Sequence, residues 1–362
     1  MPFSSEPVAI EIASSSGSYN IAIGNGLLDR ELTQTGDYLF IIDDFLAPRF
    51  AALGIDAITL KAEEETKSLD RMSALIEAIK QRGATRQTTL IGVGGGVVQD
   101  CVTFAASVYM RGVPWVYVPT TLLSMVDSCI GGKSSINVGP FKNIIGTFHP
   151  PQRVVIDPLL AETLDAEARA AGLCEAVKIC ICRGPEAFDA YIALDAKPQG
   201  STDSFAGIAE LCLSAKKWFI EIDEFDRKER LVLNFGHTFG HAMEAASHFA
   251  ISHGIAVGLG MLAALRLGEQ LGLTQRSDPR VQAFEAHVRG LVASVQGAAE
   301  ALRGCQISEL MQAFATDKKH SRSELAVILL GTSGAVERIM LPRNEQTLAQ
   351  IAGVFEWLKT DI

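Results

Sequence analysis

Hydrophobic residues in the first 160 positions of the chain gather in short runs that alternate with helical stretches. Runs rich in β-branched and aromatic residues predict strands at 8–12, 38–42, 88–93 and 115–118. Between two of these runs, residues 68–81 repeat their hydrophobic positions with the period of a helix. Strands that alternate with helices predict an α/β domain with a mainly parallel sheet.

After about residue 166 the β-branched clusters become rare and the helical period dominates. Helices are predicted at 167–180, 205–219 and 253–271, with loops rich in glycine, proline and small polar residues between them. We therefore expect two domains. Residues 1–166 would form an α/β nucleotide-binding domain, and residues 167–362 an all-α domain that binds metal and substrate.

Composition and charge limit the kinds of partner that the chain can have. Of its 362 residues, 48% are hydrophobic and 20% are charged, which is typical of a globular protein. The net charge of -10 argues against nucleic acid and membrane surfaces as partners. The longest apolar run, at 255–265, is too short to span a bilayer, and the first residues show no secretory signal. The seven cysteines are scattered, so we expect reduced thiols and a cytoplasmic location.

A glycine cluster follows the predicted strand at 88–93. Gly94, Gly95 and Gly96 lead into a predicted helix at 97–109, an arrangement that lets backbone amides approach a pyrophosphate. Gln99 stands where the third glycine of a dinucleotide-binding pattern would be, so a tight turn without a ligand remains an alternative. Asp43 could accept the ribose hydroxyls, or it could belong to a solvated turn.

Polar and basic residues are concentrated between positions 111 and 143, among flexible glycines. Loops at strand ends often line ligand sites in α/β proteins, and lysines can converge there on a phosphate. A solvated loop with scattered lysines is the alternative. The polar residues concerned are Arg111, Thr120, Thr121, Asp127, Lys133, Lys142 and Asn143.

Three histidines and one glutamate suggest a metal site. His237 and His241 are four residues apart, so a helix would place both imidazoles on one face, and His253 follows. With Glu175, two of these nitrogens would complete the ligand set of a catalytic zinc that keeps one position open. The alternative is that they are ordinary core histidines. Four other histidines are expected to have no role in a site: His149, His248, His287 and His320.

Several motifs in consistent order resemble the 3-dehydroquinate synthases and the wider sugar phosphate cyclase family. The resemblance covers nearly all of the chain. Its motifs lie at 94–100, 109–112, 118–123, 126–128, 131–133, 142–143, 171–175 with Lys178, and 233–241.

The resemblance implies a homodimer with an N-terminal NAD-binding domain, a helical C-terminal domain and a site in the cleft between them. The implied zinc ligands are Glu175, His237 and His253, with cobalt possible in place of zinc. Implied cofactor-side residues are Asp43, Glu64, Lys67, Gly95, Gly96, Asp100, Thr120, Thr121, Asp127, Lys142 and Thr163. Implied catalytic and substrate-side residues are Lys133, Asn143, Lys178, Lys216, Arg230, Asn234 and His241, together with Arg111 from the neighbouring subunit.

The chain departs from the family pattern at a few positions. Gln99 replaces a usual glycine, and Phe45 stands where a polar adenosine contact is common. Ile255 replaces a usual glutamate, so we expect weaker support of His253 by its surroundings. Either Lys318 or Lys319 should close over the phosphate.

The implied reaction converts 3-deoxy-arabino-heptulosonate 7-phosphate to 3-dehydroquinate, with NAD used catalytically for oxidation and later reduction. Phosphate is eliminated between these steps, and an aldol reaction closes the ring. The cations Lys216 and Arg230 favour a substrate carboxylate, and therefore the heptulosonate over the neutral sedoheptulose 7-phosphate. The alternatives are a cyclase for that neutral sugar, a metal-dependent polyol dehydrogenase and a catalytically silent binding protein.

Overall fold

The computed structural model describes residues 7–139, 141–317 and 319–362, and these residues divide into two compact units. The first unit contains the described residues up to Thr163 together with Ser201–Phe225, and the second contains Leu164–Gly200 and Asp226–Ile362. The first stretch ends at Thr163, whereas the sequence predicts a boundary after residue 166. The segment Ser201–Phe225 differs from that expectation, because its helix packs on elements of the first unit.

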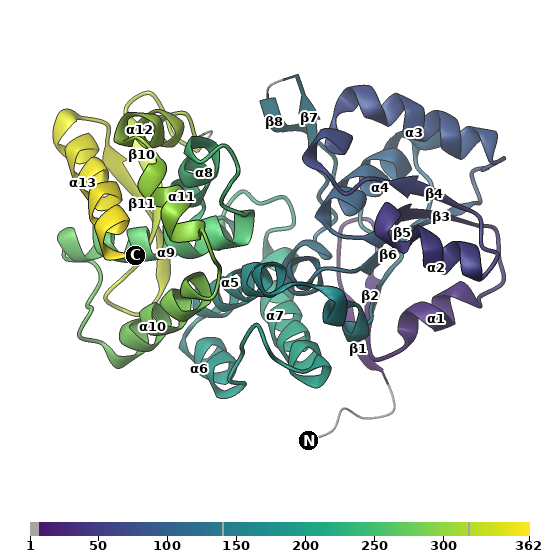
Figure 1. Cartoon of the computed structure of the whole chain (residues 1–362), viewed down its shortest axis with the longest axis horizontal. Helices are drawn as coiled ribbons and strands as arrows, with labels where there is room; N and C mark the ends of the chain where they lie inside the picture. The colour runs from purple at the N-terminus through teal and green to yellow at the C-terminus, as the bar shows by residue number, and fades with distance from the viewer. Residues whose placement is uncertain (1–6, 140, 318) are drawn as a thin grey trace. The chain divides into compact units, whose positions relative to one another are not determined.

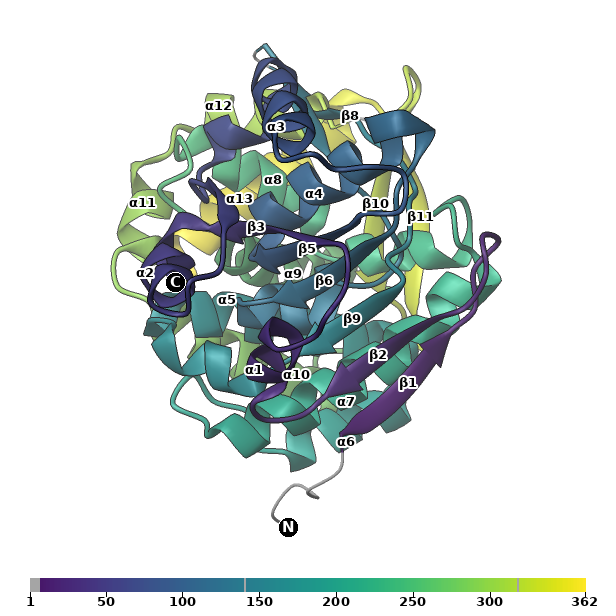
Figure 2. The same ribbon diagram turned by 90° about the vertical axis from the view of Figure 1, so that its right-hand side faces the viewer.

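The first unit is built on a mainly parallel sheet. Its strand order among the described residues is β1-β2-β9-β6-β5-β3-β4, and only β1 and β2 pair in antiparallel fashion. Figure 2 shows β3, β5, β6, β9, β2 and β1 side by side in this order. The strands are β1 (Val8–Ile12), β2 (Tyr19–Ile23), β3 (Tyr38–Asp43), β4 (Ala57–Leu60), β5 (Thr89–Gly94), β6 (Trp115–Pro119) and β9 (Arg153–Ile156).

Helices and short turns complete the first unit, and the predicted mainly parallel α/β architecture is confirmed. α4 packs on the central strands β5 and β6, and α7 contacts β1, η4 and η5. The α-helices are α1 (Leu27–Leu32), α2 (Ala47–Ala52), α3 (Leu69–Gln81), α4 (Gly96–Val108) and α7 (Thr202–Ile222). The short turns are η1 (Asp44–Leu46), η2 (Glu64–Lys67), η3 (Tyr109–Arg111), the π-helical η4 (Ser124–Ser128) and η5 (Pro158–Thr163), and a hairpin joins β7 (Ile136–Val138) to β8 (Phe141–Ile145).

The second unit is mainly helical, as predicted. Its helices are α5 (Ala166–Arg183), α6 (Pro185–Ala193), η6 (Glu229–Asn234), α8 (His237–Ala246), α9 (His253–Gln270), α10 (Pro279–Ala293), α11 (Ala298–Gly304), α12 (Ile307–Ala315) and α13 (Glu345–Asp361). An antiparallel pair, β10 (Glu324–Leu330) and β11 (Val336–Pro342), is an addition to the expected all-α domain. β10 is apolar and buried over Leu325–Leu330, so this strand forms part of the hydrophobic core of the second unit.

Helix α9 is the centre of the second unit, because α5, α8, α10, α13 and β10 all pack on it (Figure 1). Most of its residues are buried, as expected of a helix that is apolar on every side. Glycine residues of α9 allow the neighbouring helices to approach it closely. A Cβ atom on Gly254 would lie 2.3 Å from the carbonyl oxygen of Ala171 in α5, and one on Gly260 only 2.0 Å from that of Gly236, which precedes α8. The three helices that carry the predicted metal ligands therefore meet at glycine contacts.

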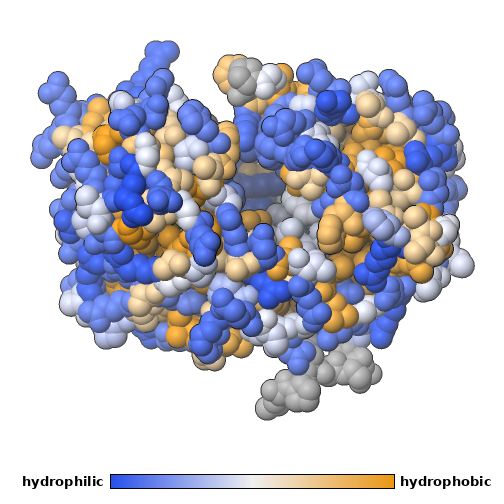
Figure 3. All heavy atoms as spheres, in the orientation of Figure 1, coloured by the Kyte–Doolittle hydropathy of each residue, from blue (hydrophilic) through white to orange (hydrophobic). Residues whose placement is uncertain are grey.

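The surface agrees with the composition. On the face drawn in Figure 3, hydrophilic residues surround scattered hydrophobic patches. Within the described ranges, no helix combines the length and the apolar character that crossing a membrane requires.

Candidate metal centre and nucleotide turn

Glu175, His237 and His253 are brought together by α5, α8 and α9. Oε1 of Glu175 lies 3.7 Å from Nε2 of His237 and 3.4 Å from Nε2 of His253. Two ligands bound at about 2.0–2.1 Å to a tetrahedral zinc ion are about 3.3 Å apart. The observed separations therefore fit a shared divalent cation, and the donor set of two imidazoles and one carboxylate suits zinc or cobalt.

Hydrogen bonds behind both histidines orient their Nε2 atoms toward this position. Nδ1 of His237 lies 3.2 Å from the carbonyl oxygen of Phe235, and Nδ1 of His253 lies 3.1 Å from Oε2 of Glu244. Both partners can only accept, so each Nδ1 carries the proton and donates it. A neutral imidazole then presents its Nε2 lone pair to a metal, which is the usual arrangement at metal-binding histidines.

The electrostatics of the cluster favour a bound cation. Glu175 is 1% exposed, and its burial favours the neutral acid, yet the charge of Lys178 and the hydrogen bond to His253 hold the pKa of the carboxyl well below its usual value. Burial keeps the pKa of His237 well below its usual range, so that ring is neutral. Burial also opposes the charging of His253, but its bonds to Glu175 and Glu244 raise its pKa to about 10. A divalent cation would replace that proton.

Glu244 corrects one expectation from the sequence. Ile255 is buried in the core, and the carboxylate behind His253 comes from Glu244 on another helix. Glu244 lies on α8, three residues after His241 and seven after His237, and this helical spacing could have identified it. His241, Glu244 and His253 also form a group with closely spaced ligand atoms. Because Glu244 already accepts the proton of His253, this second group fits a supporting role.

His241 lies beside the cluster on the same face of α8, as the spacing predicts. Its ring centroid is 5.4 Å from that of His237, and its side chain is 43% exposed. Nδ1 of His241 lies 3.6 Å from a carboxylate oxygen of Asp317, which also pairs with Lys319 at 3.0 Å. Asp317 was not singled out in the sequence. Lys318 lies outside the described residues.

Other predicted residues of the second unit have specific partners. Lys178 forms a buried ion pair with Oε2 of Glu175. Arg230 and Asn234 lie on η6, whereas α8 begins only at His237, so these two residues and His237 belong to different helical elements. Gly236, with φ +79°, separates the two helices. The Asn234 side chain donates to the carbonyl oxygen of Leu231.

The glycine cluster links the end of β5 to the start of α4. The strand order of the sheet reverses beside it, between β3 and β5. β5 lies beside β3 on one side and β6 on the other, and ligands of such sheets bind at the carboxyl ends of the strands at this point. Asp43 ends β3, next to the end of β5, and Thr120 donates its amide to the carbonyl of Gly94. A Cβ atom on Gly96 would meet no other atom within 4 Å, and no acidic residue lies in the first turn of α4. The open helix start fits a dinucleotide phosphate, and the segment Gly94–Gly96 is called the nucleotide turn below.

A polar network includes Asp100 of α4 and residues of neighbouring elements. Asp100 pairs with Lys67 at 2.9 Å, and burial raises the pKa of its carboxyl to about 6 although Lys67 opposes this shift. Glu64 lies 3.8 Å from Lys67 and 3.9 Å from Lys142. The Asn137 side chain, which sequence analysis missed, donates to Glu64 at 2.8 Å and accepts from the Asn143 amide at 2.9 Å.

The remaining predicted residues of the first unit are spread over several elements. Lys216 on α7 pairs with Asp127 on η4 at 2.6 Å, so this lysine belongs to the first unit. Lys133 lies over the Phe148 ring, and Arg111 is exposed at φ +69°. The other side chains make local bonds: Asp43 accepts from the Phe45 amide, Thr121 pairs with Ser124, and Thr163 donates to the Leu160 carbonyl.

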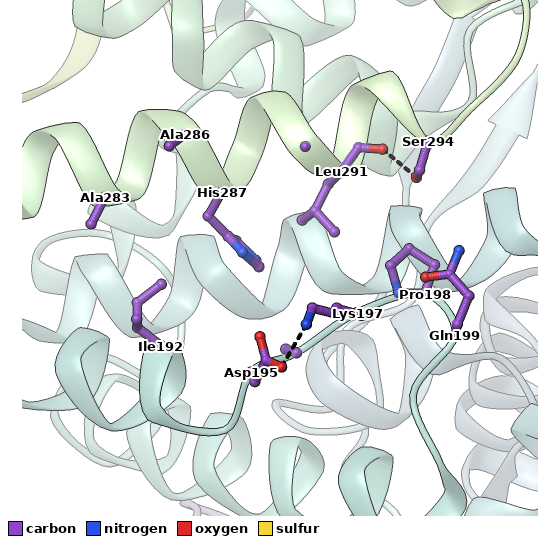
Figure 4. Close-up of a pocket in the computed structure, with 12 residues that line it drawn as sticks. Ile192, Asp195, Lys197, Pro198, Gln199, Ala283, Ala286, His287, Leu291 and Ser294 are labelled. Carbon is purple, nitrogen blue, oxygen red and sulfur yellow. Dashed lines mark hydrogen bonds and ion pairs between the residues drawn. The ribbon is translucent and has the colours of Figure 1, made fainter.

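A separate cavity of about 410 Å³ lies between α6 and α10 in the second unit (Figure 4). Its described lining residues include His287, Lys197 and Leu291 but none of the predicted site residues. His287 bonds to the Tyr191 hydroxyl at 3.0 Å. His149 and His320 likewise bond to backbone groups.

Comparisons with known proteins agree with the motifs. The family model described as 3-dehydroquinate synthase N-terminal matches residues 57–171, and the one described as C-terminal matches residues 172–320. The 3-dehydroquinate synthase of Xanthomonas oryzae is 32% identical, with 98% of this chain and 100% of that protein covered. The corresponding values for Xylella fastidiosa are 34%, 92% and 89%.

Solved structures share the fold. A 2-deoxy-scyllo-inosose synthase with carbaglucose-6-phosphate, NAD+ and Co2+ has a TM-score of 0.83 at 24% identity and covers 96% of this chain and 99% of its own. The 2-epi-5-epi-valiolone synthase of Streptomyces hygroscopicus with NAD+ and Zn2+ bound has a TM-score of 0.79 at 24% identity, with coverages of 97% and 99%. A probable glycerol dehydrogenase from Sinorhizobium meliloti is less similar, with a TM-score of 0.61 at 15% identity over 93% and 95% of the two chains. The chain belongs to the 3-dehydroquinate synthase family.

Proposed function

We propose that this protein is a 3-dehydroquinate synthase, a lyase that converts 3-deoxy-arabino-heptulosonate 7-phosphate to 3-dehydroquinate and inorganic phosphate. The observation that carries the proposal is the cluster of Glu175, His237 and His253, whose facing atoms are spaced for one divalent cation in a chain of this family. The NAD+ and the Zn2+ or Co2+ in the structures with the same fold support the same cofactors here. The product would feed the shikimate pathway.

NAD would supply a hydride acceptor that later returns the hydride, and the divalent cation would polarise a substrate hydroxyl so that it ionises more easily. Glu175, His237 and His253 would hold the cation. Lys178 would act through Glu175, because its ammonium group neutralises the oxygen that faces away from the histidines. Glu244 would keep the Nε2 lone pair of His253 directed at the cation.

The cofactor would be held by the first unit. The amides at the start of α4, at Gly95 and Gly96, would bind the pyrophosphate, and Asp43 would accept the ribose hydroxyls. The further side chains that we assign to the cofactor are Glu64, Lys67, Asp100, Thr120, Thr121, Asp127, Lys142 and Thr163.

Basic and polar side chains would bind the substrate by its charged groups. Elimination releases phosphate as an anion. Nearby cations stabilise the negative charge that develops on this leaving group in the transition state. We assign Lys133, Asn143, His241 and Arg111 to the phosphate, with Asp317 behind His241. Arg230, Lys216 and Asn234 would bind the carboxylate end, and the neutral sedoheptulose 7-phosphate has no carboxylate to occupy them. We therefore propose the heptulosonate as the substrate.

The purified protein, supplied with NAD and zinc, provides the direct test. We expect release of inorganic phosphate from the heptulosonate, 3-dehydroquinate as the identified product, and no net NADH, because the hydride is returned. Faster phosphate release from sedoheptulose 7-phosphate would reject the proposed substrate. Accumulation of NADH without phosphate release would instead indicate a polyol dehydrogenase, and binding without any turnover would indicate a silent relative.

We also propose a cytoplasmic homodimer in which Arg111 serves the neighbouring subunit. The odd number of scattered cysteines supports a reducing compartment. Arg111 is exposed at the end of a short turn and so is available to another subunit. Light scattering tests the dimer. Mixing Arg111→Ala subunits with His237→Ala subunits should restore part of the activity if each supplies what the other lacks, whereas sites completed within one subunit would stay inactive in the mixture.

A further inference from the structure

Gln99 is a buried polar residue in the first turns of α4. It is 4% exposed, and its side-chain amide makes two reciprocal hydrogen bonds with Ser128. Its Nε2 donates to the Ser128 carbonyl oxygen at 2.7 Å, and its Oε1 accepts from the Ser128 hydroxyl at 2.6 Å. A buried amide that is satisfied on both atoms fixes its partner more strictly than a single bond would.

Ser128 is the last residue of the π-helical turn η4, and its neighbour Asp127 carries the ion pair with Lys216. Nζ of Lys216 lies 2.6 Å from the Asp127 carboxylate and also donates to the Asp127 carbonyl oxygen. π-Helical turns are uncommon and are often found at functional sites. Gln99 holds η4 through Ser128, from a helix whose first residue, Gly96, belongs to the nucleotide turn.

We propose that Gln99 is a positioning residue that fixes η4, and with it the Asp127–Lys216 pair, relative to the start of α4. The next residue of α4 reinforces this arrangement from the other direction, because Asp100 accepts the backbone amide of Ser135 at 2.9 Å. Consecutive side chains of one helix thus hold both ends of the segment between Ser128 and Ser135. Gln99 touches neither substrate nor cofactor in this role and acts through Ser128.

The inference rests on the proposed function only where it concerns turnover. If Lys216 binds the substrate carboxylate, loosening η4 should weaken substrate binding more than it slows the chemical step. The Gln99→Met variant keeps the length of the side chain and removes both hydrogen bonds. We expect its KM for the heptulosonate to rise about tenfold, which corresponds to about 1.4 kcal/mol, with a smaller change in kcat.

Val102→Ala is the matched control, because Val102 is fully buried on the same helix and makes no contact that the inference uses. Both variants should unfold at a lower temperature. Only Gln99→Met should raise KM and speed amide hydrogen exchange in residues 124–129, measured on the full-length protein with and without NAD. Equal exchange and equal KM in the two variants would show that Gln99 only contributes to stability.

Ser128→Ala separates the two bonds, since it removes the hydroxyl and keeps the carbonyl acceptor. Its effect on exchange should be smaller than that of Gln99→Met, and the double variant should be no worse than Gln99→Met alone. Additive effects would overturn the inference. If the wild-type protein released no phosphate from the heptulosonate, the proposed function would fail, but the exchange measurements would still decide whether Gln99 fixes η4.

Discussion

At the scale of single residues, the candidate metal centre depends on the hydrogen-bond partners of its histidine ligands. Glu244 accepts the Nδ1 proton of His253 and so sets which ring nitrogen is available. Removing such a partner typically weakens metal binding 10- to 100-fold. We expect Glu244→Gln to lower zinc affinity within this range, because a neutral amide can accept the same proton but no longer attracts the cation.

Competition with a chromogenic chelator measures this affinity. His237→Ala should lose stoichiometric zinc and turnover together, since it removes a ligand. His248→Asn should retain wild-type affinity, because His248 lies in the turn after α8 at φ +51°, a conformation that asparagine tolerates. Zinc retained at full stoichiometry in His237→Ala would exclude the proposed ligand set.

His287 gives a residue-scale prediction about pH in a part of the molecule remote from the metal ligands in sequence. Burial lowers its pKa to about 4, although the charge of Asp195 opposes the shift. Between about pH 4 and its ordinary pKa of about 6.5, the unfolded chain binds a proton that the folded chain does not. The stability due to this group is therefore present above pH 6.5 and is lost as the pH falls toward 4.

The contribution to the slope of the unfolding free energy is at most about 1.4 kcal/mol per pH unit. His287→Gln keeps a polar partner for the Tyr191 hydroxyl but cannot titrate, so its stability should depend less on pH in this range. Urea unfolding of both proteins at several pH values measures the difference. Parallel curves for the two proteins would contradict the assignment.

At the scale of elements, the contacts between helices decide whether the ligands meet. A Cβ atom on Gly260 of α9 would lie 2.0 Å from the carbonyl oxygen of Gly236 and 2.8 Å from the amide of Gly240, so alanine would push α8 and α9 apart. We expect Gly260→Ala to cost about 1–3 kcal/mol of stability and to weaken zinc binding, because it separates His237 from His253.

Gly353→Ala is the control for this substitution. Gly353 lies in the middle of α13, and a Cβ atom there would meet nothing within 4 Å. Alanine should therefore raise stability by up to about 1 kcal/mol and leave zinc binding unchanged. Denaturant unfolding and zinc titration of both variants provide the comparison. A change of zinc affinity in Gly353→Ala that follows its change in stability would mean that the affinity reports stability rather than helix spacing.

The elements also show how far the sequence could be interpreted. Local patterns predicted α3, α4, α5, α7 and α9 and the strands β1, β3, β5 and β6, because hydrophobic period, run length and flanking turn residues identify each type of element. It missed the pair β10 and β11, since an apolar run of this length also fits a buried helix. It could not show that α7 packs in the first unit, because the period of a helix says which face is buried and not against what.

The same limit applies to the site. Spacing on one helix placed His237 and His241 together, and it would have added Glu244. The approach of Glu175 to these histidines depends on contacts such as Gly254 against Ala171, which no local pattern reveals. The reciprocal bonds between Gln99 and Ser128 join residues 29 positions apart, so no local pattern reveals them either.

At the scale of the whole molecule, the residues proposed to bind NAD pyrophosphate and those proposed to bind zinc belong to different compact units. The proposed nucleotide turn lies in the first unit, and the candidate metal ligands all lie in the second. A ligand that binds only the folded state stabilises it, by about 2.7 kcal/mol at a concentration 100 times its dissociation constant. The stabilisation should be strongest in the elements that hold the ligand, because local opening there must release it.

We therefore expect zinc and NAD to protect different parts of the chain from amide hydrogen exchange. Zinc added to chelator-treated protein should slow exchange in α5, α8 and the start of α9, which carry Glu175, His237 and His253. NAD should slow exchange at the end of β5 and the start of α4. The His237→Ala variant should lose the zinc response and keep the NAD response. Zinc protection centred on the first unit would contradict the proposed ligand set, whereas absence of NAD protection at Gly94–Gly96 would contradict the nucleotide turn and leave the metal assignment standing.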